Sequence, residues 1–471
     1  MTKETGLRMV AMLKKNIKNA LSGPSCWMYI AILVILSFAL YWRTLNFGFV
    51  LDDYYEVRGY SLREIISIFC SGWDSTGIGP KFYRPLVVIS YALNHLFFKA
   101  NPFGYHLTSI ILNMINVILV YFVMIKIGGR PISGFVTAVL FLLMPYNAFS
   151  ASWISHRYDV VMAIFYLGSF LAFASFYNNA NRKYSLYYFS ILCYIFALMS
   201  KEMAVTLAFV ILLYSYLESK KLEIKLIMPY FVILCSYMIF RFLIFKEIGG
   251  FTAMFPLYEA IPLNLSLAFL RAFIPFSYMN PYYLVIYLLL FFILIYFGAI
   301  YFKSFKNKNK IFFAFFWICL TILPLYTIAR SRLLYLPSIG FAMLLSLTCL
   351  KLYQNNVKYA VIFIIGLCFM LAVVNIKYQN TFFSPTNTMV LDSEKGMYAL
   401  YYNKLDKEPL AILEQKLQRY GLLNEAKDLM GRGGKNDESG DQMRTLGTYM
   451  KELYAQGRWR GIFKKVFSAP I

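Results

Sequence analysis

The stretch GFVLDDYYEV at residues 48–57 places two adjacent carboxylates, Asp52 and Asp53, directly after the first strongly apolar segment of the chain. Even on the mildest insertion scale, a charged side chain at the centre of a bilayer costs roughly 2.5–3.5 kcal/mol. Paired acids beside a membrane span therefore belong either to a solvated loop or to a chemical site. Which of the two applies depends on where the other apolar segments put this loop.

The composition is that of a polytopic membrane protein. Of the 471 residues, 60% are hydrophobic, 19% aromatic and only 15% charged, which is more apolar than a soluble core requires. The net charge of +23 comes from Lys and Arg between apolar runs and not from a basic domain, so we predict no nucleic-acid partner. The seven cysteines lack C-x-x-C spacing and the three histidines are widely separated, so neither a disulfide framework nor a metal site is predicted.

Hydropathy predicts an all-α protein with about eleven transmembrane helices of roughly 17–25 residues each. Residues 1–24 are basic and mildly amphipathic and are predicted to form a cytoplasmic interfacial helix. The next apolar run is predicted to be an uncleaved signal anchor. The spans are expected at residues 25–42, 105–125, 132–150, 159–177, 184–199, 203–217, 224–245, 282–302, 311–329, 333–352 and 357–376.

Basic residues in alternate short loops predict the orientation, with the N-terminus in the cytoplasm. These loops hold Lys126 and Arg130, Arg182 and Lys183, Lys220, Lys221 and Lys225, Lys303, Lys306, Lys308 and Lys310, and Lys351 and Lys358. The opposite loops carry the unusual polar clusters: the acidic pair, KFYRP at 81–85, WISHRYD at 153–159, SKE at 200–202 and ARSRLLYLPS at 329–338. The topology therefore brings distant motifs to one extracytoplasmic site.

Two large outer loops and a tail complete the predicted organisation. In the first loop, about 44–104, SLREIISIFC (61–70) has apolar residues at helical spacing and YRPLVVISYALNHLFF (83–98) is too short to span, so both are predicted to lie in the outer interface. The second loop, about 247–281, is predicted to contain another surface-lying helix. Residues 377–471 are predicted to form a small helical tail outside the membrane, with helix pairs that resemble incomplete tetratricopeptide units.

The motifs FVLDD, YRPL with LNHL and NPFGYHL, WISHRYD, SKE and LYLPSIGF occur in this order. In that order they resemble the membrane region of the transmembrane and tetratricopeptide-repeat O-mannosyltransferases. These enzymes belong to the GT-C class, which also includes protein O-mannosyltransferases and the aminoarabinose transferase of lipid A. The resemblance covers about residues 25–376 and implies a GT-C fold. The long repeat array of the eukaryotic members is absent and is replaced by the short tail. The absence of a clear secretory-pathway elaboration favours a bacterial inner-membrane enzyme with its active site facing the periplasm or exterior.

The resemblance implies inverting transfer of a sugar from a polyprenyl-monophosphate donor to a hydroxyl of a protein, lipid or glycan acceptor. Such chemistry needs a carboxylate base within about 2.6–3.2 Å of the hydroxyl and cations aimed at the departing phosphate. No metal or other cofactor is required when cationic side chains take that role. The expected partners are membrane lipids, the lipid-linked donor and the acceptor, and the oligomeric state stays open.

By motif position, the resemblance assigns the catalytic acid to Asp52, with Asp53 as its neighbour and substitute, and a second acid to Asp159. Asp159 has an alternative reading as a residue that caps its helix. Candidates for binding the donor phosphate are Lys81, Arg84, Lys201, Arg241, Arg330, Arg332 and Tyr335, although any of the cations could instead snorkel to the interface. Candidates for orienting the acceptor are Tyr83, His156, Arg157 and Glu202, the last also being predicted to pair with Lys201 or a nearby arginine.

Three alternative functions stay open. A polyprenyl-diphosphate-dependent oligosaccharide or polymer ligase would share an outer-face site. A lipid or polysaccharide transporter should show inverted repeats and charges near the bilayer midplane, neither of which the sequence displays. A non-catalytic scaffold would carry the acids without using them.

Overall fold

The computed structural model describes residues 24–50, 53–72, 82–179, 182–219, 222–245, 261–273, 308–326, 331–355 and 357–383. Within these ranges all regular structure is helical and no strand occurs, as predicted. The α-helices are α2 (Pro24–Tyr41), α3 (Asp53–Glu56), α4 (Leu62–Cys70), α5 (Pro85–Phe98), α6 (Pro102–Lys126), α7 (Pro131–Leu143), α8 (Pro145–Ser152), α9 (Arg157–Tyr177), α10 (Tyr184–Leu198), α11 (Leu207–Ser219), α12 (Ile224–Phe245), α13 (Ile261–Phe273), α15 (Asn309–Ile322), α16 (Tyr335–Asn355) and α17 (Val357–Phe383). Short 3₁₀ turns are η1 (Trp42–Asn46), η2 (Ile154–His156), η3 (Glu202–Thr206), η6 (Leu323–Leu325) and η7 (Ser331–Leu333).

Seven described segments are long and apolar enough to cross a membrane, so the chain is an integral membrane protein. They are Cys26–Asn46, Pro102–Lys126, Ile154–Tyr177, Glu202–Ser219, Ile224–Phe245, Tyr335–Asn355 and Val357–Asn380. The bent pair α7 and α8 is an eighth if counted as one span, and α5, α10 and α15 with η6 are shorter apolar helices. The predicted span 282–302 lies outside the described residues. The count of eleven and the orientation stay predictions.

The predicted span 132–150 is not one straight helix. Helices α7 and α8 meet at an angle of 69° around Met144, because Pro145 lacks an N–H and disfavours helical backbone in the residue before it. Asn147 donates from Nδ2 to the carbonyl of Phe141, one of the acceptors that the break releases. All eight residues of α8 are buried, and α8 packs on α6 and α17. A broken backbone at membrane depth is tolerated where protein encloses it in this way.

The centre of the bundle is α9, which packs along α10 and α6. Aromatic rings fill the space beside it, with Phe170 contacting Tyr214 at 5.1 Å and Phe313 at 5.5 Å between ring centroids. Helices α15 and α16 approach very closely at Gly340, where an added Cβ would lie 2.7 Å from the carbonyl oxygen of Ala314. Small residues of this kind permit the close helix contacts on which membrane bundles depend.

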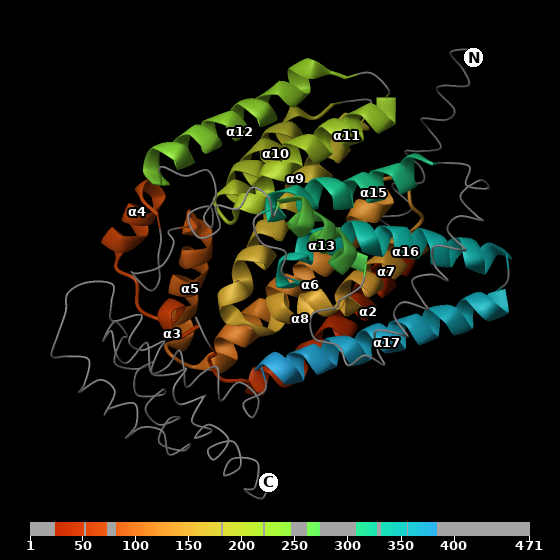
Figure 1. The fold of residues 1–471 in the computed structure, drawn as a ribbon, viewed down its shortest axis with the longest axis horizontal. Coiled ribbons are helices and arrows are strands. Elements are labelled where there is room, and N and C mark those ends of the chain that lie inside the picture. The colour runs from red at the N-terminus through yellow and green to blue at the C-terminus, as the bar shows by residue number, and fades with distance from the viewer. Residues whose placement is uncertain are drawn as a thin grey trace, which may run out of the picture.

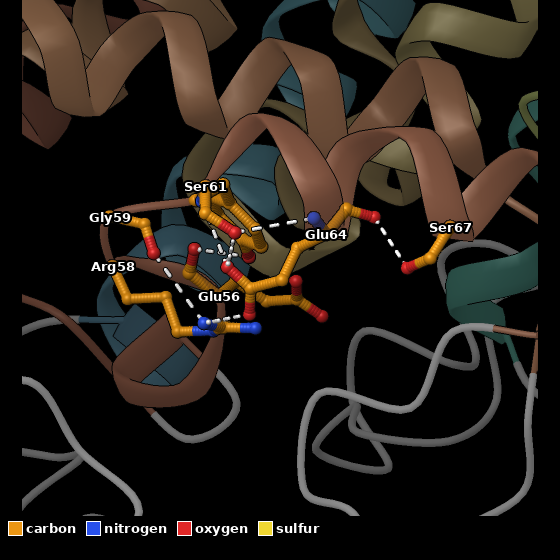
Figure 2. Close-up of polar contacts among 7 residues, drawn as sticks. Glu56, Arg58, Gly59, Ser61, Glu64 and Ser67 are labelled. Atoms are coloured by element: carbon orange, nitrogen blue, oxygen red, sulfur yellow. Dashed lines mark hydrogen bonds and ion pairs between the residues drawn. The ribbon is translucent and has the colours of Figure 1, made fainter.

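The short helices α3, α4 and α5 gather at one end of the bundle (Figure 1). The predicted helices at 61–70 and 83–98 are thereby confirmed as α4 and α5. Helix α4 begins with a capping box: Glu64 N–H donates to Ser61 Oγ at 3.2 Å, and Ser61 N–H donates back to Glu64 Oε2 at 2.8 Å. Arg58 adds an ion pair to Glu64 at 2.9 Å, and Figure 2 shows both side chains at the start of α4. This cap fixes where the chain turns from α3 into α4.

The helix predicted in the second large loop is α13, which packs against α15 and α16, with Ala268 buried and Ser266 exposed. Helix α17 extends to Phe383, seven residues beyond the predicted end of the last span at residue 376. Residues 1–23 of the predicted interfacial helix (1–24) and residues 384–471 of the predicted tail (377–471) lie outside the described residues.

Candidate functional site

A buried ion pair lies at the start of α9. Lys201 Nζ donates to Asp159 Oδ1 at 2.6 Å, and both side chains are at most 2% exposed. His156 stands one turn before Asp159, with its Nδ1 3.3 Å from Asp159 Oδ2. Taking two charges out of water costs several kcal/mol of desolvation per ion, so such a pair is weak evidence for stability and stronger evidence for a functional site.

A second ion pair adjoins the first, since Lys201 and Glu202 are consecutive. Arg84 donates to Glu202 Oε1 at 3.2 Å. The Arg84 guanidinium lies 4.1 Å from the centre of the Phe82 ring and 4.2 Å from that of Tyr158, while Lys201 Nζ lies 4.6 Å from the Tyr158 ring. The Tyr158 ring thus contacts both cations, in a geometry that stabilises positive charge.

The two cations respond differently to burial. Burial opposes the charged form of Arg84, but Glu202 together with Tyr158, Asp159 and Glu56 outweighs it and raises the pKa of Arg84. For Lys201, burial is the larger effect and lowers its pKa in spite of Asp159. Arg84 therefore stays cationic, and the charge of Lys201 depends on its carboxylate partner.

Two further arginines complete the positive cluster. The Arg332 guanidinium lies 5.2 Å from the ring of Trp153, which also stacks on His156 at 5.3 Å. Arg241 of α12 is 1% exposed, donates to Tyr237 Oη at 3.2 Å and interacts electrostatically with Glu202. Arg84, Lys201 and Arg241 thus act on the carboxylates of Asp159 and Glu202, and Arg332 adjoins them through Trp153 and His156.

Asp53 is bonded through both carboxylate oxygens. Its Oδ1 accepts from the N–H of Ser155 at 2.7 Å and from Ser155 Oγ at 2.5 Å, and its Oδ2 accepts from the N–H of Val50 at 3.0 Å. The side chain is fully buried. Asp53 therefore ties the loop after α2 to η2, immediately before α9. Asp52, Lys81 and Arg330 lie outside the described residues.

Three other predicted site residues form hydrogen bonds to groups outside the cation cluster. Arg157 is fully buried and donates to Asn94 Oδ1 at 2.5 Å and to the Tyr105 carbonyl at 3.0 Å, which joins the start of α9 to α5 and α6. Tyr83 donates to the Phe69 carbonyl at 3.3 Å and packs on α12, which joins α12 to α4. Tyr335 donates to an asparagine of α6. These contacts hold the helices around the cluster.

A polar row on α6 escaped the sequence-based prediction. It consists of His106, Ser109, Asn113 and Asn116, all fully buried and spaced by three, four and three residues. Such spacing puts all four side chains on one face of the helix. The signal was present, since polar residues at helical spacing inside an apolar run mark a face that avoids lipid.

The chemistry available to these side chains is that of an anion site beside a carboxylate. Arginine binds phosphate oxygens in a bidentate fashion and lysine acts as a point charge. Among the residues that the structure describes, no group of three or more His, Cys, Asp or Glu side chains is arranged to hold a metal ion.

Comparison with curated proteins identifies the class: the homologues of this chain are membrane glycosyltransferases of the GT-C family, which confirms the resemblance found in the motifs. In particular they are transmembrane and tetratricopeptide-repeat O-mannosyltransferases. Protein O-mannosyl-transferase Tmtc1 of Drosophila melanogaster is 28% identical over 36% of this chain and 21% of its own length. Human Protein O-mannosyl-transferase TMTC3 is 26% identical over 31% of this chain and 16% of its own length. Human Protein O-mannosyl-transferase TMTC2 is 27% identical over 41% of this chain and 24% of its own length.

The matched segments thus span less than a quarter of the length of these relatives. No protein-family model matches the chain.

Proposed function

We propose that this protein is an inverting glycosyltransferase that moves a sugar from a polyprenyl-monophosphate donor to an acceptor hydroxyl. Mannose is the sugar in the names of its relatives and is our first choice. The observation that carries the proposal is the cluster in which Arg84, Lys201 and Arg241 act on Asp159 and Glu202, with Arg332 beside them and with Lys201, Arg241 and Asp159 buried.

The charge balance supports a monophosphate carrier. A sugar phosphodiester has one negative charge, and the polyprenyl monophosphate that leaves carries about 1.5 to 2 negative charges at neutral pH. Because negative charge grows on the leaving phosphate, the cations of the cluster complement the product more fully than the substrate. Cations fixed in advance in a water-excluded site stabilise such developing charge strongly, because they need not reorganise during the reaction.

The reaction is a single displacement. The acceptor oxygen forms a bond to the anomeric carbon, the bond from that carbon to the phosphate oxygen breaks, and the phosphate leaves with the electron pair. The proton of the acceptor hydroxyl passes to a carboxylate. We assign this base to Asp52 from its place in the FVLDD motif, because the carboxylate of Asp53 is committed to Ser155 and Val50. Attack opposite the leaving group inverts the anomeric centre.

The distribution of basic loops supports a site on the extracytoplasmic face, and a bacterial inner membrane is the proposed location. The donor enters from the lipid phase. The acceptor is a hydroxyl of a protein, lipid or glycan, and the side chains of the cluster supply the electrostatic role for which other transferases use a metal ion.

The test uses the full-length protein in liposomes with radiolabelled polyprenyl-phosphate mannose and an envelope extract as acceptor. We expect transfer by the wild type and a loss of about 100-fold or more in Arg84→Gln, the cost typical of removing one group that stabilises transition-state charge. Arg182→Gln is the matched control, since Arg182 forms an exposed ion pair with Glu223 in the connection that follows α9, at the opposite end of that helix from Asp159.

Turnover of a polyprenyl-diphosphate sugar with none of the monophosphate would replace this proposal with the ligase alternative. Equal activity of the Arg84 and Arg182 variants would remove the cation cluster from the mechanism.

A further inference from the structure

The polar row on α6 lies inside a membrane span, and two of its members form a network with α16. Tyr335 Oη donates to Asn113 Oδ1 at 2.7 Å and accepts from Asn116 Nδ2 at 3.1 Å. Asn116 Nδ2 also donates to the carbonyl of Val160 at 2.9 Å. These bonds define which way both amides point, because reversing Asn116 would set its oxygen against the Val160 carbonyl.

The network leaves one donor and one acceptor unused. Among the described residues, Asn113 Nδ2 and Asn116 Oδ1 have no hydrogen-bond partner, and both side chains are fully buried. In the hydrocarbon region no bulk water can satisfy such groups, so they are expected to meet a ligand or an ordered water.

The two amides adjoin the cation cluster. Val160, which accepts from Asn116, follows Asp159 directly in the first turn of α9. Tyr335 begins α16 two residues after the end of η7, which carries Arg332, and interacts electrostatically with Asp159. Any ligand that reaches these amides is therefore beside the place proposed for the donor phosphate.

The unused groups distinguish between parts of that donor. A phosphate offers acceptors only and would leave Asn116 Oδ1 unsatisfied, and a prenyl chain offers neither donor nor acceptor. A sugar hydroxyl both donates and accepts, so hydroxyls can satisfy a donor and an acceptor that lie one helical turn apart. We infer that Asn113 and Asn116, held by Tyr335, form a subsite that recognises hydroxyl groups of the transferred sugar. This inference rests on the proposed function and names its specificity determinant.

The first experiment compares binding of two probes to the full-length protein in nanodiscs: polyprenyl-phosphate mannose and sugar-free polyprenyl phosphate. We expect Asn113→Leu to weaken binding of the mannose-bearing lipid by about 10-fold or more, the effect of losing hydrogen bonds in a buried site. Binding of the sugar-free lipid should not change. Thr137→Val is the matched control, because it removes a buried hydroxyl inside α7 whose hydrogen bond among the described residues is to the Ser133 carbonyl of its own helix.

The second experiment begins with the wild type, so its first result does not depend on Asn113→Leu folding. Monodeoxy analogues of the mannose donor are tested on the wild type, and we expect one hydroxyl whose removal weakens binding by about 10-fold or more. Asn113→Leu should bind this analogue about as weakly as it binds the complete mannose donor, because the hydroxyl has already lost its amide partner.

Equal weakening of both lipids in Asn113→Leu would make the asparagines structural and overturn the inference. The inference would also be overturned if the wild type bound every deoxy donor with the same affinity. A donor-bound density map that shows an ordered water, and no sugar, on the two amides would have the same consequence. In those cases the wild type still binds both lipids and the proposed function stands. Failure of the wild type to bind either lipid would instead remove the proposed function, and this inference with it.

Discussion

Asp53 and Ser155 are joined by two hydrogen bonds, 2.7 Å from the backbone N–H and 2.5 Å from the side-chain hydroxyl of Ser155, across 102 residues of chain. The pair closes the loop after α2 onto the start of α9. These bonds make Asp53 an anchor, and for that reason we propose its neighbour Asp52 as the catalytic base.

Substitution of the two acids should therefore have different consequences. Asp52→Asn is expected to lower sugar transfer by about 100-fold to 10,000-fold, the range typical of general base catalysis, with the unfolding temperature unchanged. Asp53→Asn and Ser155→Ala should each destabilise the protein by about 1–3 kcal/mol, because a buried partner is left unsatisfied. Thermal unfolding in detergent and a transfer assay measure the two effects. A stable but inactive Asp53→Asn protein together with an active Asp52→Asn protein would reverse the assignment.

The Lys201–Asp159 pair offers a test that separates stability from function. Lys201→Met should cost about 3–5 kcal/mol, since it leaves Asp159 charged, buried and without its lysine. The double variant Lys201→Met, Asp159→Leu should recover most of that stability and none of the sugar transfer. Denaturant unfolding and the transfer assay are the measurements, and a double variant that regained activity would show that the pair is only structural.

The start of α4 should respond to acid. Burial alone would raise the pKa of Glu64, but hydrogen bonds from Ser61 and Arg58 prevail and lower it from its ordinary 4.5 (Figure 2). A depressed carboxyl pKa contributes stability that is present above pH 4.5 and is lost as the pH falls through the lower, folded-state value. Amide hydrogen exchange along α4, corrected for the intrinsic pH dependence of exchange, should therefore accelerate in acid. Glu64→Gln should abolish that acceleration, and an identical acid response in the variant would contradict the cap assignment.

Packing of α15 on α16 predicts a sharp contrast between two glycines. Gly340→Ala brings a methyl group to 2.7 Å from the Ala314 carbonyl oxygen and should destabilise the protein by about 1–3 kcal/mol. Gly366→Ala in α17 is the matched control, because nothing lies within 4 Å of its added Cβ. The unfolding temperature of each variant in the same detergent gives the comparison. Equal unfolding temperatures of the two variants would mean that α15 and α16 can move apart to admit the methyl group without loss of stability.

The helical class, the positions of the described spans and the convergence of distant motifs followed from the amino-acid sequence. Hydropathy and loop charge are local properties, and a bilayer acts on each segment almost independently. The break at Pro145 was also open to prediction from local chemistry, although the span 132–150 was expected to be continuous. The homology to O-mannosyltransferases was visible for the same reason, since its motifs are short and keep their order along the chain.

The division of roles among those residues required the tertiary structure. Only the packing of α5 beside η3 pairs Arg84 with Glu202, 118 residues apart, and only the meeting of η2 with the loop after α2 makes Asp53 an anchor. Asn113, Asn116 and Tyr335 likewise become a network because Tyr335, at the start of α16, reaches the polar face of α6. Hydrogen bonds and ion pairs form only when segments far apart in sequence are placed to within a few tenths of an ångström. No local pattern of residues contains that information.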